Sequence, residues 1–160
     1  MNRRQFLSSS TAALAAGAVP GTFAADAPPV FIGKVVKTDA EWRLLLAPAQ
    51  FNVLREEGTE RSFTSPLNDE KRKGTFVCAG CALPLFDSRT KYDSGTGWPS
   101  FWDVIKGRIE TKIDRKYIYT VTEYHCARCG GHQGHIFEDG PKPTGLRYCN
   151  NGVALKFILT

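Results

Sequence analysis

The spacing of apolar residues predicts a helix that begins close to residue 39. Thr38-Asp39-Ala40-Glu41 has the form of a capping box, in which the Thr38 hydroxyl accepts from a backbone N–H one turn on and Glu41 reaches back. A helix that begins there places three apolar side chains on one face. These side chains are Trp42, Leu45 and Leu46.

A second short helix is predicted around Pro48. Proline fits the first turn of a helix and not its interior, so Pro48 ends the first helix or begins the second. The second helix carries apolar residues at Phe51, Val53 and Leu54, and we expect Gly58 to stop it. Two small helices therefore precede the rest of the domain.

After Gly74 the apolar spacing changes to a period of two, which is typical of strands. Runs rich in aromatic and β-branched residues occupy 75–77, 83–86, 117–124 and 153–159, with turn residues between them. The last run should close the core, with one side of its pleat formed by Val153, Leu155, Phe157 and Leu159. The pattern predicts a mainly β fold in a single domain, since 160 residues can bury one core without disulfides.

The amino end has the features of an export signal, so it is kept out of the fold prediction. Arg3 and Arg4 precede a modest apolar stretch, 12–19, and small residues at 24–27, which resembles a twin-arginine signal. We expect a signal peptide over 1–25, a linker over 26–37 and the folded domain over 38–160. The apolar stretch is too short to span a bilayer. We therefore expect export, most simply to the periplasm, without stable membrane insertion.

The charge pattern argues against nucleic acid as a partner. The formal net charge of +5 falls by two, to +3, without Arg3 and Arg4. The most basic run, 71–73, follows two acidic residues and is typical of a solvated loop. A zinc ribbon that binds nucleic acid would cluster its basic residues among exposed aromatics, whereas they are scattered here.

Four of the five cysteines form two Cys-x-x-Cys pairs, which are separated by 44 residues. Each pair turns both sulfurs to one side, so the pairs can bind one tetrahedral ion through Cys78, Cys81, Cys126 and Cys129. Four sulfurs leave no position for water, which predicts a structural zinc. Two disulfides, or an iron or redox centre, are the alternatives; export would favour disulfides. A twin-arginine route carries folded cargo, however, so the metal can be bound before export.

His132 and His135 suggest a second, catalytic zinc or an acid/base pair. They are three residues apart in a glycine-rich segment, with neither a third ligand of settled spacing nor the helix of a zinc hydrolase motif. We therefore favour hydrogen bonding or acid/base chemistry.

Cys149 is the fifth cysteine and has no partner in either pair. Arg147 lies two residues earlier, on the same side of an extended strand, where its charge favours the reactive thiolate. Asn151 shares that side if the strand continues. A buried, inert thiol is the alternative.

Three motifs carry a family resemblance: residues 97–101 (GWPSF), 132–141 (HQGHIFEDGP) and 147–151 (RYCNN). Together with the two cysteine pairs, they resemble methionine sulfoxide reductase B, the enzymes that reduce the R epimer of methionine sulfoxide in peptides. The resemblance covers about 38–157. It implies two twisted antiparallel sheets (a β-tent) with small helices at the amino end.

The resemblance also implies a role for each candidate residue. A sulfoxide sulfur is a poor electrophile until its oxygen is protonated, so a thiolate acts together with an acid. The implied roles are attack by Cys149, proton delivery by His135 or His132, orientation of the imidazoles by Asp139, contact with the oxygen or its water by Asn151, stabilisation of the thiolate by Arg147, and an apolar wall for the substrate methyl group at Trp98. A core tryptophan is the alternative at position 98.

Methionine would then be released, and Cys149 would be oxidised to a sulfenic acid. Many members of the family carry a resolving cysteine just before the Trp-Pro-Ser-Phe run, whereas this chain has Thr96. With the other four cysteines on the metal, we expect an external thiol or a thioredoxin-like dithiol protein to reduce the sulfenic acid. The alternative from another class is a non-catalytic zinc β module that binds a ligand. Such a module needs neither Cys149 nor the histidines.

Overall fold

The computed structural model describes residues 32–115 and 120–160. The predicted signal peptide, 1–25, and the first half of the predicted linker, 26–31, lie outside these ranges, as do residues 116–119. The rest of the linker is an irregular segment, in which the Val35 N–H donates to the Arg128 carbonyl at 2.8 Å. Among the described residues, no helix is long and apolar enough to span a bilayer.

Helix α1 (Asp39–Leu45) begins at the predicted capping box. The Thr38 hydroxyl accepts from the Glu41 N–H at 3.3 Å, and Glu41 accepts from the Thr38 N–H at 2.7 Å. Trp42 is buried and Leu46, just past the helix, is also buried. The prediction for Leu45 is wrong: its side chain is 61% exposed, because the helix is so short that only its Trp42 side packs against the domain.

Helix α2 (Pro48–Glu56) begins at Pro48 and buries Phe51, Val53 and Leu54, as predicted. It packs against the six-stranded sheet and not on α1 alone. The residue that ends it is Glu57, which adopts the left-handed conformation at φ 54°, rather than Gly58. Gly58 instead allows the backbone to pass close to Asn52, since a Cβ at position 58 would lie 2.0 Å from the Asn52 side chain.

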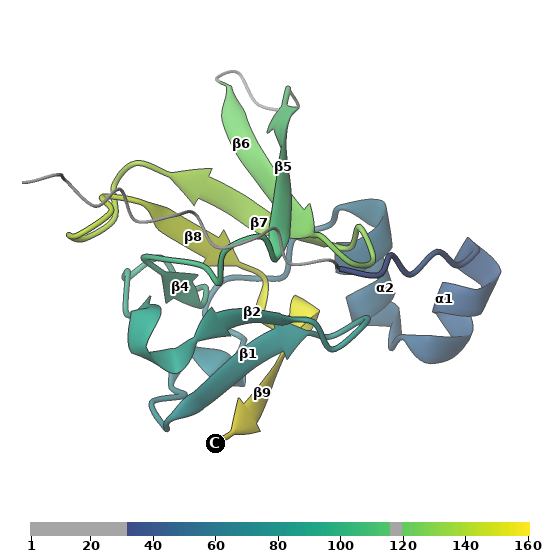
Figure 1. The fold of residues 1–160 in the computed structure, drawn as a ribbon, viewed down its shortest axis with the longest axis horizontal. Coiled ribbons are helices and arrows are strands. Elements are labelled where there is room, and N and C mark those ends of the chain that lie inside the picture. The colour runs from purple at the N-terminus through teal and green to yellow at the C-terminus, as the bar shows by residue number, and fades with distance from the viewer. Residues whose placement is uncertain (1–31, 116–119) are drawn as a thin grey trace, which may run out of the picture.

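The strands form two antiparallel sheets (Figure 1), which confirms the predicted fold class. The smaller sheet has the order β2-β1-β9, with β1 (Gly74–Cys78), β2 (Pro84–Asp87) and β9 (Leu155–Leu159). The larger has the order β3-β4-β8-β7-β6-β5. Its strands are β3 (Lys91–Tyr92), β4 (Ser100–Phe101), β5 (Ile109–Asp114), β6 (Val121–Cys126), β7 (His132–Phe137) and β8 (Arg147–Asn150). Three 3-10 turns complete the fold: η1 (Pro66–Asn68), η2 (Ser88–Thr90) and η3 (Gly152–Ala154).

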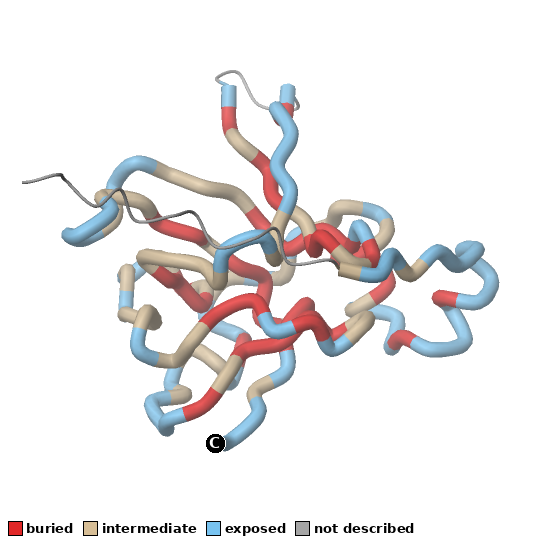
Figure 2. The backbone as a smooth tube through the Cα atoms, in the orientation of Figure 1, coloured by how far each residue is buried: buried red, intermediate tan, exposed pale blue. Residues whose placement is uncertain are grey.

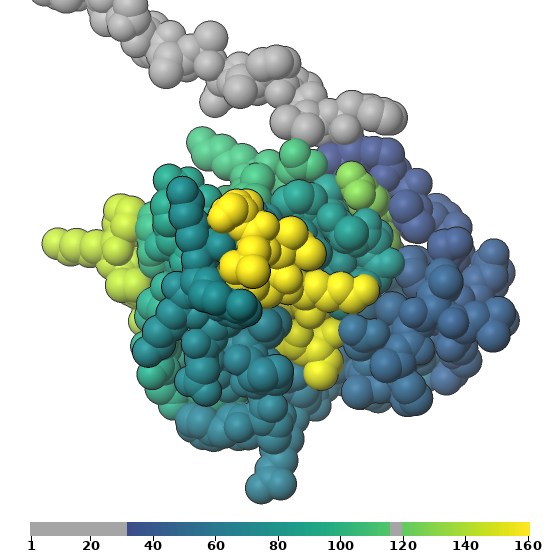
Figure 3. Space-filling view, turned by 90° about the horizontal axis from the view of Figure 1, so that it is seen from below, coloured from purple at the N-terminus to yellow at the C-terminus, as the bar shows by residue number. Residues whose placement is uncertain are grey.

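Two predicted strands have different limits. The run predicted over 117–124 overlaps with β6, which begins at Val121 and continues to Cys126, while 117–119 lie outside the described residues. The run predicted over 153–159 begins as η3, so Val153 is not in the strand. In β9 only Leu155 is fully buried, and Leu159 is 59% exposed at the edge of the small sheet. Figure 3 shows this C-terminal segment on the surface between the β1–β2 hairpin and the helices.

Aromatic side chains fill the space where the two sheets face each other. Phe86 of the small sheet stacks on Phe101 of the large sheet, with ring centroids 4.1 Å apart and planes 9° apart. Phe76 meets the edge of Phe101 at 4.9 Å, and Tyr124 meets Tyr148 at 5.7 Å. Figure 2 shows buried residues concentrated between the sheets. The opposite face of the large sheet is thus free to carry polar side chains.

Candidate active site

A row of side chains crosses all six strands of the large sheet in direct register. Antiparallel partners project from the same face, so the residues of the row lie side by side. From β3 to β5 the row is Tyr92, Ser100, Cys149, His135, Glu123 and Lys112. The register therefore brings the lone cysteine next to one of the two candidate histidines.

An irregularity in β7 places the second histidine near this row. In a regular strand, residues three apart point to opposite faces. Here Tyr124 pairs with Gly134 and His125 pairs with His132, which leaves Gln133 as the extra residue of a bulge. His132 and His135 consequently meet, with ring centroids 5.5 Å apart. The His-x-x-His spacing in the sequence is thus matched to a bulged strand rather than to a helix.

A small cavity of about 120 Å³ lies over the centre of the row. It is lined by Thr59, Trp98, Gly134, His135, Phe137, Cys149, Asn150 and Asn151. Four of the predicted site residues thus share one cavity: Cys149, His135, Asn151 and Trp98. His132 is fully buried and lines a different hollow of about 240 Å³, with Glu57 and His125.

Cys149 is half-buried, and two opposing effects act on its ionisation. Burial raises the pKa of the thiol above its ordinary range, whereas the charge of Arg147 and hydrogen bonds from Thr96 and Arg147 lower it. Burial is the larger effect, so the net shift is upward. Arg147 thus favours the thiolate without making it the resting form.

Asp139 binds Arg147 through both of its carboxylate oxygens. Its two carboxylate oxygens accept from Arg147 Nε and Nη2 at 2.7 and 2.8 Å, and the guanidinium lies 4.2 Å from the centroid of Phe137. The hydrogen bonds from Arg147 lower the pKa of Asp139. The carboxylate of Asp139 thus holds the cation that flanks Cys149, and the orientation of the imidazoles by Asp139 stays a prediction.

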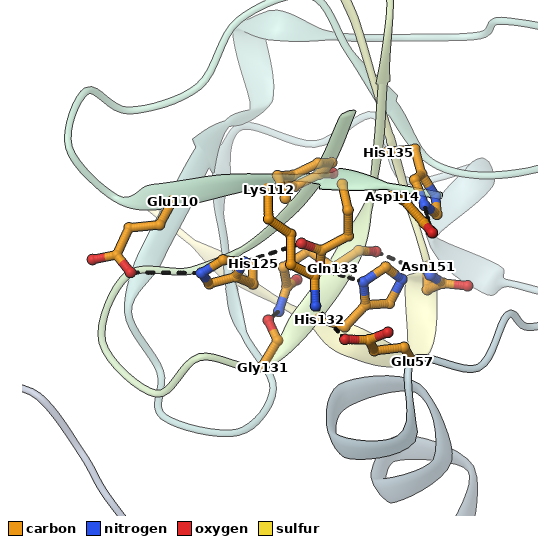
Figure 4. Close-up of polar contacts among 12 residues, drawn as sticks. Glu57, Glu110, Lys112, Asp114, His125, Gly131, His132, Gln133, His135 and Asn151 are labelled. Carbon is orange, nitrogen blue, oxygen red and sulfur yellow. Dashed lines mark hydrogen bonds and ion pairs between the residues drawn. The ribbon is translucent and has the colours of Figure 1, made fainter. Parts of the chain in front are cut away.

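Two other carboxylates hold the histidines. His132 Nδ1 lies 2.6 Å from Glu123, whose second oxygen lies 3.1 Å from His125 Nδ1. His135 Nε2 lies 2.9 Å from Asp114, and Figure 4 shows these two side chains next to each other. Burial alone would raise the pKa of Glu123, but hydrogen bonds and charge from His125 and His132 lower it to about 2.

The sequence analysis missed Glu123 and Asp114. For Glu123 the available signal was an acidic residue inside a strand, Val121–Cys126, that is mostly apolar, aromatic or β-branched. Asp114 gives no such signal, because its strand, Ile109–Asp114, also carries Glu110 and Lys112. An acidic residue, when buried, needs a partner. The pairing itself depends on strand register and could not be read from spacing alone.

Asn151 follows the end of β8 and connects three parts of the site. Its side-chain carbonyl accepts from the Glu60 N–H at 2.9 Å, and its amide donates to the Gln133 carbonyl at 3.0 Å. The Glu60 carboxylate accepts from the Gly152 and Val153 N–H groups, and its backbone carbonyl accepts from Trp98 Nε1 at 3.1 Å. This network fixes the tryptophan wall relative to β8, and Glu60 is a further residue that spacing did not indicate.

The four predicted metal-binding cysteines meet at one point. Their sulfurs all lie within 4.8 Å of one another, with Cys78 to Cys129 at 3.7 Å and Cys81 to Cys126 at 3.5 Å. A tetrahedral ion with Zn–S bonds of ~2.3 Å needs sulfurs about 3.8 Å apart, whereas a disulfide needs ~2.05 Å. The cluster therefore fits one tetrahedral metal ion and does not form the two disulfides of the alternative reading.

This β fold places a partly buried cysteine, a histidine and a tryptophan around one small cavity, an arrangement typical of enzymes that use a thiol. The SelR domain family model matches residues 46–159. Curated relatives named "Peptide methionine sulfoxide reductase MsrB" are similar over most of both chains. The relative from Pseudomonas putida is 55% identical over 78% of this chain and 94% of its own length. The relative from Methanosarcina barkeri is 52% identical over 77% and 87%.

The chain therefore belongs to the methionine sulfoxide reductase B family, a family of oxidoreductases that act on methionine sulfoxide. A relative from Leptospira interrogans, with the same name, is 50% identical over 78% of this chain and 95% of its own length. Among solved structures, the Mis18 "Yippee-like" domain is 16% identical with a TM-score of 0.43, over 56% of this chain and 98% of that one.

Proposed function

We propose that this chain reduces the R epimer of methionine sulfoxide in polypeptides, with Cys149 as the nucleophile. The observation that carries the proposal is the shared cavity, because Cys149, His135 and Trp98 line the same small space. Nucleophile, acid and apolar wall are the three components that thiol attack on a methyl sulfoxide requires.

In the first step, the Cys149 sulfur attacks the sulfoxide sulfur while the sulfoxide oxygen gains a proton. His135 is our assignment for the proton donor, because it lines the cavity beside Cys149 and Asp114 orients its ring. His132 lines the second hollow, and its ring packs against the edge of the His135 ring, so we assign it a supporting role. Since burial keeps Cys149 protonated at rest, the proton that the thiol loses can be the one that the imidazole passes to the oxygen.

The oxygen then moves to Cys149 and methionine leaves. Cys149 gains the oxygen as a sulfenic acid and is oxidised by two electrons, while the sulfoxide is reduced by two. In this step Trp98 supports the methyl group, and the second N–H of the Asn151 amide is available to the oxygen. Arg147, held by Asp139, stabilises negative charge on Cys149.

An external thiol then restores the enzyme. Position 96 carries threonine, and the other four cysteines lie together in one cluster that could hold a metal ion. A thiol or thioredoxin-like dithiol attacks the sulfenic sulfur and releases water, and a second thiol frees Cys149 as a new disulfide leaves. The cluster would hold a structural zinc, which supplies cross-linking and takes no part in these steps.

We also propose that the chain works outside the cytoplasm, in the repair of exported proteins. The support is the Arg3-Arg4 pair and the apolar stretch after it, which lie outside the described residues. Replacing both arginines by lysine should retain the protein in the cytoplasm in a fractionation experiment.

An epimer-resolved assay tests the reaction. The wild type should reduce the R epimer of a methionine sulfoxide peptide and leave the S epimer, and Cys149→Ser should reduce neither. Mass spectrometry after one turnover without reductant should find a dimedone adduct at Cys149. A disulfide between Cys149 and a cluster cysteine would refute the proposed recycling, and full activity of Cys149→Ser would refute the nucleophile.

A further inference from the structure

Phe63 combines a strained backbone with an exposed aromatic side chain. Its φ is 62°, in the left-handed region that bulky residues avoid, and its side chain is 73% exposed. It is not part of the hydrophobic core formed by the described residues. Single exposed apolar residues are common on protein surfaces. This one, however, occupies a backbone position that glycine would fill with less strain.

The surrounding structure holds the strained turn in place. The Phe63 N–H donates to the Gly97 carbonyl at 2.7 Å, and the same carbonyl accepts from Asn68 Nδ2 at 3.0 Å. Three residues before Phe63, the Glu60 carbonyl accepts from the Trp98 indole. The phenyl ring lies directly over Gly97, where a Cβ would be 2.7 Å from the ring. The ring is therefore fixed next to the tryptophan wall, and strain held in this way is typical of functional sites.

The cavity over Cys149 is large enough for only the end of a side chain. Its volume is about 120 Å³. A pocket that encloses a whole small molecule has a volume of several hundred Å³. Trp98 also lines a second hollow of about 130 Å³, which has Phe63, Asp69 and Lys91 at its edge. The residues that flank an oxidised methionine must cross the rim of the first cavity, and beyond Trp98 they reach this second hollow.

We propose that Phe63 is a substrate-docking residue, whose ring packs on the polypeptide segment next to the oxidised methionine. The inference rests on the proposed function and deepens it, because it extends recognition beyond the sulfoxide side chain. The ring provides an apolar contact, and Asp69 and Lys91 provide polar partners for the backbone of the segment. Free methionine sulfoxide has no flanking residues and cannot use this contact.

Two substrates separate docking from chemistry. Phe63→Gly removes the ring and suits the left-handed backbone, so the fold should persist. We expect this variant to lower kcat/KM about fivefold to tenfold for a blocked pentapeptide with methionine (R)-sulfoxide at its centre. For free methionine (R)-sulfoxide the change should stay within about twofold. Val36→Gly is the matched control, since Val36 is 91% exposed in the irregular segment before α1.

Binding measurements make the test independent of turnover. In a Cys149→Ser background, Phe63→Gly should weaken binding of the sulfoxide pentapeptide by the same factor in calorimetry. Equal losses for both substrates would overturn the inference, because Phe63 would then only support Trp98; so would an unchanged kcat/KM for the peptide. If the wild type turns over neither substrate while Phe63 still governs peptide binding, the proposed function fails and the docking role stands.

Discussion

Two opposing effects act on the pKa of the Cys149 thiol. Burial in the cavity wall raises its pKa, and Arg147 lowers it. Arg147 is itself fixed by the bidentate contact with Asp139 and by the ring of Phe137. The reactivity of this thiol therefore depends on a cation that a second residue holds in place.

Removal of the cation should make Cys149 harder to ionise. Arg147→Met keeps the apolar stem over Phe137 but loses the charge, so the pKa of Cys149 should rise further and the alkylation curve should move to higher pH. At pH 8 we expect alkylation by iodoacetamide to slow about threefold to tenfold. Mass spectrometry of zinc-loaded protein distinguishes Cys149 from the cluster cysteines. An unchanged pH profile would show that Arg147 does not act on the sulfur.

Glu123 is hydrogen-bonded to two histidines, so its replacement should lower the free energy of unfolding. Glu123→Ala leaves the buried His132 without its carboxylate and leaves His125 with Glu110 at 3.5 Å, and should lower the free energy of unfolding by about 3–5 kcal/mol. Glu123→Gln should cost less, because the amide keeps one acceptor. Urea unfolding at pH 7 of zinc-loaded protein measures both variants.

The pH dependence of this effect has a definite sign. The folded pKa of Glu123, about 2, is below its ordinary value of 4.5. The stabilisation is therefore complete above about pH 5 and is lost as the pH falls toward 2. The difference in the free energy of unfolding between the wild type and Glu123→Gln should therefore become smaller as the pH falls from 5 toward 2. Arg89→Gln, which removes an exposed ion pair, is the control and should change stability by about 0–1 kcal/mol.

At the scale of elements, the site is a property of strand register. Cys149 and His135 are fourteen residues apart in the sequence, and adjacent because β7 and β8 pair in one register. The bulge at Gln133 then adds His132 to the same group. A shift of one residue would send each side chain to the opposite face.

Gly134 permits the close approach of these two strands. A Cβ there would lie 1.9 Å from the backbone carbonyl oxygen of Cys149, so Gly134→Ala must push β7 away from β8. We expect a loss of roughly 2–4 kcal/mol in the free energy of unfolding, with activity reduced at least tenfold. Thermal unfolding and the peptide assay measure the two effects. Gly33→Ala, where nothing lies within 4 Å, should be neutral, and a neutral Gly134→Ala would contradict the described register.

Features that depend on adjacent residues could be predicted from the sequence, and features that depend on register could not. The capping box at Thr38 and the two Cys-x-x-Cys pairs involve residues close in the chain, and both are present as predicted. The strands β3 and β4 have two residues each, too few for a periodic signal. The contact between Asp139 and Arg147 was not predicted for the same reason, because spacing places Asp139 near the histidines and only the fold places it on Arg147.

At the scale of the whole molecule, the cysteine cluster joins the two sheets. Cys78 ends β1 of the small sheet and Cys126 ends β6 of the large one, and each pair contributes two sulfurs to the same point. The aromatic layer between the sheets is another connection, and Gln133 Nε2 of β7 also lies 3.5 Å from Cys78 Sγ of β1. A bound ion would add a link through all four sulfurs to these contacts.

Removal of the metal should unfold the domain. Zinc in small Cys-rich sites contributes about 10–16 kcal/mol of binding free energy, which is comparable to the ~5–15 kcal/mol that stabilises an entire domain. Without the ion, four thiols, three of them buried, would face one another and repel on ionisation. Dialysis against a strong chelator should therefore abolish the cooperative thermal transition, and readdition of one equivalent of zinc should restore it.

Cys126→Ser should lose the metal in elemental analysis, while Cys149→Ser should keep one zinc per chain and the wild-type melting temperature. A metal-free chain that melts cooperatively at the same temperature would show that the aromatic layer alone holds the sheets together.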